Sequence, residues 1–200
     1  MQFTLGSRIQ PMTNPAEKTP QPKQEQIGMI SIQRAEKKDL DTVWTIIENC
    51  AKWLADQGLR HWADHYTKDI LATMIQKLEV YVATQNGTAV STITFGMRPP
   101  KYYLEEGYVQ RFTDPEALAA YVMALGVLPG YQRKGIAGKM VEFVEALAKQ
   151  RGVTWLRLDC RLEVPGIVPF YERRGFRKVG EPLQEGEGES YWLMEKNIGK

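Results

Sequence analysis

A strand, a glycine-rich turn and a helix follow one another over residues 118–150, and this unit constrains the fold more than any other part of the sequence. Residues 118–127 form an apolar, strand-like run, which Leu128-Pro129-Gly130 interrupts. From Gly135 to Gln150 apolar residues recur at helical spacing, and a second strand is expected at 155–159. A strand–helix–strand unit of this kind predicts an α/β domain.

The remaining elements are weaker but consistent with that class. Residues 96–116 lack a period and are expected to form a long loop or insertion, which in a compact domain is more often functional than idle. The other expected elements are a strand at 29–32, a helix from Leu40 to Leu54, a helix at 70–78 capped by Thr67, strands at 80–83 and 90–93 around an Asn86-Gly87 turn, a short helix opened by Pro165 and ended by Gly175, and a strand pair at 176–179 and 191–194.

Residues 1–28 differ in composition from the rest of the chain. They contain four prolines, several glutamines and almost no apolar periodicity, so they cannot bury enough surface to offset the entropy of ordering. We interpret them as a flexible N-terminal extension and residues 29–200 as a single folded domain. A transit peptide is the less favoured alternative, because Arg8 is the only arginine in the segment.

Bulk composition excludes several classes of protein. Hydrophobic residues make up 43% and charged residues 25%, and the net charge of +2 is too small to indicate a nucleic-acid or membrane-surface partner. No apolar run approaches the roughly 20 residues that a membrane span needs. The only cysteines, Cys50 and Cys160, form no disulfide framework, which suits a reducing compartment. A cytoplasmic protein without nucleic-acid or membrane partners is expected.

The turn before the helix has the composition of a phosphate site. A helix N-terminus offers free N–H groups and partial positive charge, and the small residues at 135, 137 and 138 let a diphosphate reach the backbone. Arg133 and Lys134 add positive charge. A Walker A loop is excluded because Ile136 stands where lysine is required, and no Gly-x-Gly-x-x-Gly triple occurs. A plain helix start with small residues for close packing is the alternative.

Two motifs together resemble a known family. The run from Gln132 to Gly138 resembles Gln/Arg-x-x-Gly-x-Gly/Ala, the pyrophosphate loop of the GNAT superfamily of N-acetyltransferases, and Val164 to Phe176 resembles that family's closing Phe-Tyr-Glu-x-x-Gly-Phe motif. The resemblance is close over residues 121–176 and loose over 29–196. It implies the GNAT acyl-CoA N-acyltransferase fold, a central mixed β-sheet flanked by helices, and acetyl-CoA as co-substrate.

The resemblance also implies site residues. Backbone groups of the strand would pair with the cofactor's pantetheine arm, and the turn would hold its pyrophosphate. The implied cofactor-binding residues are Leu125, Val127, Gln132, Arg133, Lys134, Gly135, Ile136, Ala137 and Gly138. Val164 stands where the family often has an asparagine that helps to hold the cofactor, so this contact should be weaker here.

Tyr171 matches the family position that gives a proton to the departing CoA thiolate. A phenol stays protonated at neutral pH until the thiolate develops beside it, which suits this role. The alternative is a buried tyrosine that merely packs its ring and bonds its hydroxyl. Cys160 needs no catalytic role, because transfer in this family is direct, and it is interpreted as a small buried hydrophobe.

The acceptor side is less defined by the sequence. Trp62, Tyr102 and Tyr103 are candidates for an aromatic wall, although packing explains them equally well. His61 and His65 flank Trp62, and Asp64 lies beside them. No third ligand stands at a recognisable spacing, so no metal site is expected. Glu105, Glu106, Asp114 and Glu116 are candidate bases, and Glu181, Glu185, Glu187 and Glu189 form an acidic loop; solvated surface is the favoured interpretation of both groups.

These observations predict an N-acetyltransferase that moves the acetyl group of acetyl-CoA directly to a primary amine. The aromatic insertion at 96–116 favours a small-molecule acceptor over a protein chain. A catalytically weakened CoA-binding sensor or interaction module of the same fold is the alternative, motivated by Val164 and the lack of an obvious base. The sequence leaves open whether the chain forms a homodimer and whether another acyl group is transferred.

Overall fold

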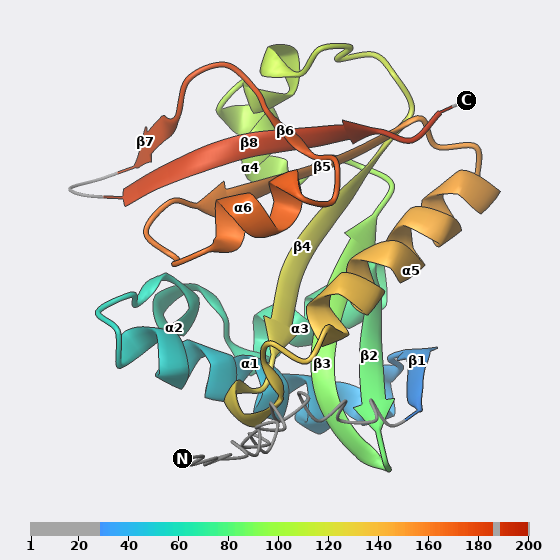
Figure 1. Cartoon of the computed structure of the whole chain (residues 1–200), viewed down its shortest axis with the longest axis vertical. Coiled ribbons are helices and arrows are strands. Elements are labelled where there is room, and N and C mark those ends of the chain that lie inside the picture. Colours follow the sequence, from blue (N-terminus) through green and yellow to red (C-terminus); the bar gives the residue numbers. More distant parts are fainter. Residues whose placement is uncertain (1–28, 186–188, 200) are drawn as a thin grey trace, which may run out of the picture.

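The computed structural model describes residues 29–185 and 189–199, and a mixed eight-stranded β-sheet forms its centre (Figure 1). The strand order is β1-β2-β3-β4-β5-β8-β6, and β7 pairs with β8 beside this path. The strands are β1 (Ile30–Arg34), β2 (Glu79–Gln85), β3 (Thr88–Gly96), β4 (Ala119–Val127), β5 (Trp155–Arg161), β6 (Arg177–Lys178), β7 (Leu183–Glu185) and β8 (Glu189–Asn197). The expected α/β fold with a central mixed sheet is confirmed.

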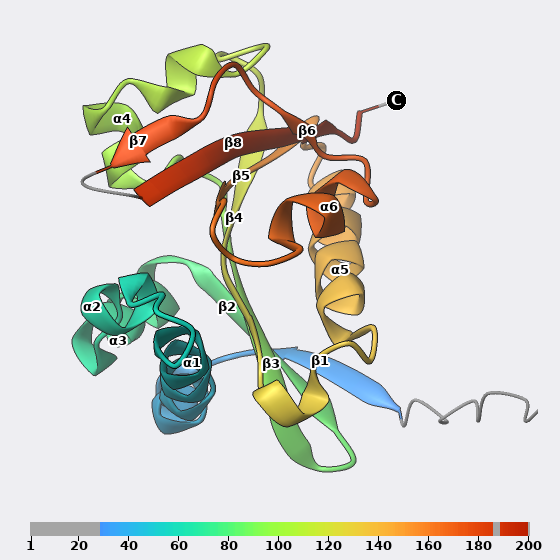
Figure 2. The ribbon, with the colours of Figure 1, turned by 60° about the vertical axis from the view of Figure 1, so that its left-hand side comes forward.

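Helices cover both faces of this sheet, with α5 and α6 on one face and α1 to α4 on the other (Figure 2). The helices are α1 (Leu40–Ala55), α2 (His61–His65), α3 (Lys68–Lys77), α4 (Lys101–Glu105), α5 (Ile136–Gln150) and α6 (Ile167–Glu172). Among the described residues, no helix is long and apolar enough to cross a membrane.

Alternation along β5 separates two hydrophobic cores. Leu156 and Leu158 belong to the core that contains Met140 of α5, whereas Trp155 belongs to the core that contains Tyr103 of α4. Because neighbouring side chains of a strand point to opposite faces, each residue of β5 is assigned to one side of the sheet. This alternation decides which side chains can reach the functional site from each face.

The neighbouring strands β4 and β5 part from one another after the third residue of β4. These parallel strands pair only over Ala119–Tyr121 and Trp155–Arg157. Beyond that point β4 continues beside β3 as far as Val127, while β5 continues beside β8 (Figure 2). An irregularity in the β3–β4 register coincides with Ala124, whose φ of 49° is unusual for a residue with a side chain. The second half of β4 therefore has no β5 partner.

Several local predictions are confirmed by the structure. Asn86 and Gly87 have φ values of 50° and 80°, the left-handed pair that a type I′ turn needs, and they join β2 to β3. The Thr67 side chain accepts a hydrogen bond from the N–H of Ile70 and caps α3. The predicted flexible extension, residues 1–28, lies outside the described residues.

Other local predictions are wrong. Residues 96–116 contain α4 and a 3-10 helix at Tyr108–Arg111 instead of an irregular loop, and α2 and β7 have no clear sequence pattern. Each has five residues or fewer, which is too short for a helical or strand period to be recognised. Pro165 precedes α6 instead of opening it, since Gly166 is the N-cap with φ 76°. The C-terminal pair is a three-strand arrangement, because β6 and β7 both pair with β8.

A buried polar network fixes the 96–116 insertion against the sheet. Arg157 and Glu195 are register partners on β5 and β8, and each is fully buried. Arg157 donates to the carbonyl of Asp114, and its guanidinium lies 4.5 Å from the ring centroid of Phe112. The Glu195 carboxylate accepts hydrogen bonds from the Thr113 N–H at 3.2 Å and from the Thr113 hydroxyl. These contacts hold the end of the insertion, and thereby position α4.

We predict that Glu195→Gln lowers the free energy of unfolding by about 2 kcal/mol, because it weakens the buried hydrogen bonds from Thr113 and removes the ion pair with Arg177 at 3.0 Å. Urea unfolding measures this free energy. The matched control is Glu142→Gln on the exposed face of α5, which should stay within about 0.5 kcal/mol of the wild type. Equal stability of the two variants would contradict the structural role of the network.

Candidate active site

The glycine-rich turn is the N-terminus of α5. Gly135 is the N-cap with φ 78°, and Arg133 has φ 60°, a conformation that side-chain-bearing residues rarely adopt. Arg133, Lys134 and Gly135 are exposed. The first N–H groups of a helix have no partner within it, so this turn offers backbone donors beside two cationic side chains. The arrangement suits a phosphate-bearing ligand.

Arg174 brings a third cationic side chain to the same turn. A Cβ added at Gly138 would collide with the Arg174 guanidinium, so glycine is needed for this close approach. The guanidinium also lies 3.9 Å from the centroid of the Phe170 ring and donates to the Phe170 carbonyl at 2.9 Å. The sequence pattern did not reveal this residue, because Arg174 lies 36 positions beyond Gly138 and outside the loop motif.

The predicted cofactor-binding residues on β4 lie on its unpaired second half. Leu125 and Val127 are half-buried there, beyond the bulge. The Val127 carbonyl accepts from Gln132 Nε2 at 3.3 Å and from Cys50 Sγ at 3.4 Å, so this oxygen is already engaged. The remaining members of the predicted set lie in the first turn of α5: Ile136 and Gly138 are buried and Ala137 is half-buried.

Tyr171 is buried beside β5. It lies on α6 with only 6% of its surface exposed, and its ring packs edge-on against Phe170 and Phe176 at centroid distances of 5.0 and 5.5 Å. It shares a hydrophobic core with Cys160. Burial raises the pKa of Tyr171 above its usual range, and the nearby Cys160 and Asp159 raise it further. The phenol is therefore protonated at neutral pH, as its predicted role requires.

On the opposite face, α2 packs against the unpaired half of β4. A Cβ on Gly126 would lie 3.2 Å from the ring of Trp62 and 3.2 Å from Cys50 Sγ. The Trp62 ring also packs edge-on against Tyr66, at a centroid distance of 5.3 Å. Trp62 thus contacts β4 beyond the point where β5 leaves it.

Asp159 of β5 accepts hydrogen bonds from two tyrosines of the insertion. The Tyr102 hydroxyl donates to Asp159 Oδ1 at 2.6 Å, and the Tyr103 hydroxyl donates to the same oxygen at 2.7 Å. Asp159 is half-buried, Tyr103 is fully buried and Tyr102 is 40% exposed. Burial raises the pKa of Tyr66, and the charge of Asp159 raises it further. Sequence reasoning missed Asp159; the available signal was the one acidic residue of a strand whose other charged residues, Arg157 and Arg161, are both basic.

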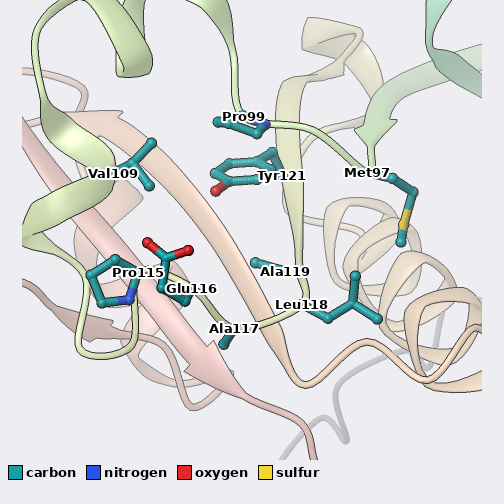
Figure 3. Close-up of a pocket in the computed structure, with 9 residues that line it drawn as sticks. All are labelled: Met97, Pro99, Val109, Pro115, Glu116, Ala117, Leu118, Ala119 and Tyr121. Atoms are coloured by element: carbon teal, nitrogen blue, oxygen red, sulfur yellow. The ribbon is translucent and has the colours of Figure 1, made fainter.

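The carboxylates that the sequence suggested as bases are all exposed. Glu105 pairs with Lys101 at 2.8 Å on the surface of α4. Glu116 lines a shallow pocket of about 270 Å³ together with Val109 and Tyr121 (Figure 3). This pocket lies at the start of β4, whereas the glycine-rich turn follows its end, so the hollow and the predicted site are separate.

The two histidines have different environments. His65 is exposed, whereas His61 is half-buried and its Nδ1 is buried without a hydrogen-bond partner. Burial, followed by the charge of Arg161, lowers the pKa of His61 to about 4. Arg161 itself is held by Glu163 and Glu189 at 2.9 Å each. Within residues 29–185 and 189–199, no group of three potential ligands has metal-binding geometry.

Comparisons with known proteins agree on one family. The sequence model of the acetyltransferase (GNAT) family matches residues 47–176. The chain is 38% identical over 63 residues to GCN5-related N-acetyltransferase 4, chloroplastic, of Arabidopsis thaliana, which covers 32% of this chain and only 22% of that protein. It is 24% identical over 147 residues to the S-(2-succino)cysteine N-acetyltransferase of Bacillus subtilis, covering 70% of this chain and 79% of that one.

A solved structure shows the same fold. The PaiA N-acetyltransferase of Thermoplasma acidophilum, crystallised in complex with coenzyme A, superimposes with a TM-score of 0.63. The two chains are 20% identical, and the match covers 84% of this chain and 99% of that one.

The lowered pKa of His61 predicts a pH-dependent stability. In the unfolded chain His61 binds a proton below about pH 6.5, whereas in the folded chain it binds one only below about pH 4. The unfolded state therefore binds more protons between these two values, and the free energy of unfolding decreases as the pH falls through this window. We expect the decrease in Tm between about pH 7 and about pH 5 to be smaller in His61→Gln than in the wild type. His65→Gln, at the exposed histidine of the same helix, should keep the wild-type decrease; an identical pH response in both variants would contradict the assignment.

Proposed function

The chain belongs to the acetyltransferase (GNAT) family, and from this premise we propose that it transfers the acetyl group of acetyl-CoA directly to the primary amine of a small molecule. The observation that carries this proposal is the combination of an unpaired β4 edge, a cationic helix N-terminus that follows it, and a buried, protonated Tyr171 beside the gap.

The residues present fit acetyl-CoA. The pyrophosphate would lie at the first turn of α5, where the first N–H groups lack a partner within the helix and Arg133 and Lys134 supply charge. The pantetheine arm would lie along Leu125 and Val127, on the half of β4 that β5 has left. When bound, acetyl-CoA supplies an activated thioester. Val164 stands where the family often has an asparagine, so the side-chain contact of that asparagine is absent. Acetyl-CoA would therefore be held by the backbone and the cationic side chains.

Tyr171 is proposed as the proton donor. In the direct transfer the amine nitrogen forms a bond to the acetyl carbon, the carbon–sulfur bond breaks, and the thiolate takes a proton from the phenol. The ammonium gives up two protons in all, of which one restores the phenol and the other passes to water. The raised pKa of Tyr171 keeps the phenol protonated at neutral pH, so its proton is available when the thiolate develops beside it.

A small-molecule acceptor is supported by the walls of the acceptor face. Helix α2 packs Trp62 onto β4, and α4 brings Tyr102 and Tyr103 onto β5, so aromatic side chains flank the gap from two sides. The B. subtilis relative is named for a small amino-acid derivative as its acceptor, which favours the same class here.

We predict that Tyr171→Phe lowers kcat roughly 100-fold while the Kd for acetyl-CoA is unchanged, because the substitution removes the donated proton but preserves the ring packing. Thiol release measures turnover with a panel of small primary amines and with peptides that offer an N-terminus or a lysine. Isothermal titration measures cofactor binding.

The matched control is Tyr81→Phe, a buried tyrosine of the same hydrophobic core whose hydroxyl instead donates to Glu79. It should leave kcat within about twofold of the wild type. If Tyr171→Phe retains full turnover, the proton-donor role is wrong. If the wild type binds acetyl-CoA but acetylates no amine, the sensor alternative replaces the enzyme, and acetylation of the peptides alone would overturn the small-molecule proposal.

A further inference from the structure

We propose that Asp159, together with Trp62, Tyr66 and Tyr102, forms the acceptor-binding site, and that this site selects a cationic primary amine that carries no carboxylate. The inference rests on the proposed acetyl transfer and specifies its acceptor. Asp159 would bind the acceptor's ammonium group, and the aromatic rings would surround it.

The position of Asp159 places this site at the gap between β4 and β5. The strands pair as far as Tyr121 and Arg157, and Asp159 is the next residue of β5 on the same face as Arg157. Tyr66 lies near enough to Asp159 for that carboxylate to raise the pKa of Tyr66, after the larger effect of burial. The Tyr66 ring packs on Trp62, and the Trp62 ring lies against Gly126 of β4. The acceptor face of the gap is therefore bordered by Asp159 at one end and Trp62 at the other.

Asp159 has no cationic partner among the residues that the structure describes. Its Oδ1 accepts from two phenols, which orient the carboxylate but carry no charge. In the described part of the chain, no lysine, arginine or histidine forms an ion pair with Asp159, although the carboxylate is half-buried. A carboxylate in such a position gains from a cationic partner, and an ammonium with aromatic neighbours gains further from cation–π contacts.

The surroundings of Asp159 disfavour an acceptor carboxylate. Two cations lie along this face of β5, Arg157 and Arg161, each two residues from Asp159. Arg157 is fully buried with Glu195 as its register partner, and the side chain of Arg161 is only 8% exposed. The Arg161 guanidinium is already paired with Glu163 and Glu189, so two carboxylates lie beside it. His61 faces the same group and stays neutral at pH 7 because its pKa is lowered to about 4. The charges of Asp159, Arg161, Glu163 and Glu189 sum to −2, and the charge of Arg157 is matched by its register partner Glu195. This excess of negative charge repels an anionic substituent.

The site is also correctly placed relative to Tyr171. Asp159 and the adjacent Cys160 point to opposite faces of β5, and Cys160 shares the core of Tyr171. An ammonium held by Asp159 would thus lie on one side of the strand gap and the phenol on the other. This separation lets one residue bind the nucleophile while a different one serves the leaving group.

The test compares a matched pair of probes, 2-phenylethylamine and phenylalanine, which differ only by the carboxylate. We expect the wild type to bind 2-phenylethylamine in isothermal titration and to acetylate it with a kcat/KM at least tenfold above that for phenylalanine. Asp159→Asn should raise the KM for 2-phenylethylamine by about tenfold or more, as expected for losing one charge-assisted contact. The Kd for acetyl-CoA should not change in this variant.

Two control variants separate binding from folding. Asp64→Asn removes an exposed carboxylate of α2 that pairs with Arg60, and it should leave both constants unchanged. Tyr102→Phe removes one hydrogen bond from Asp159 and should raise KM less than Asp159→Asn does. An unchanged KM in Asp159→Asn, equal use of both probes, or no binding of either probe would overturn the acceptor site.

Failure of the proposed function has a different signature. Amine binding is measured without acetyl-CoA, so a wild type that binds 2-phenylethylamine through Asp159 but transfers no acetyl group would refute acetyl transfer and leave the amine site standing. A wild type that acetylates other small amines, with Asp159→Asn equally active, would refute only the acceptor site.

Discussion

The parting of β4 and β5 is the constraint on which the rest of the structure depends. Two strands that remain paired along their whole length leave no backbone edge between them, but here the pairing ends at Tyr121 and Arg157. The bulge at Ala124 accompanies the bend of β4 away from its neighbour. Because β4 then leads into the positively polarised N-terminus of α5, the free edge and the turn form one continuous surface suited to a long, anionic ligand.

Because side chains alternate along β5, residues on both faces of the sheet reach the gap between β4 and β5. Asp159 faces α2 and α4, whereas Cys160 faces the core that holds Tyr171. A charged carboxylate and a neutral phenol on opposite sides of one gap suit different tasks, since the first attracts a cation and the second can give a proton. The buried network around Arg157 and Glu195 helps to position the two tyrosines that bind Asp159, because it holds the end of the insertion that carries them.

The geometry of the glycine-rich turn could be predicted from sequence and the surroundings of Asp159 could not, for a physical reason. The turn is a local feature, so the identities of residues 132–138 are sufficient to indicate a glycine-capped helix start beside two cationic side chains. Asp159 obtains its surroundings from tertiary contacts, and its partner Tyr102 is 57 residues away in the chain. The glutamates of the insertion were more conspicuous in sequence, yet Glu105 and Glu116 lie on the surface. The short helices α2 and α4, which carry the aromatic walls, have too few residues to show a period.

The central claim is that the free edge of β4 and the turn before α5 bind acetyl-CoA, and amide hydrogen exchange of the full chain tests it most directly. We expect slower exchange on adding acetyl-CoA at the N–H groups of Leu125 and Val127 and across residues 133–138, with no such protection by NAD or ATP. Acetyl-CoA binding that protects other segments and leaves these amides unchanged, or no response to acetyl-CoA at all, would contradict it.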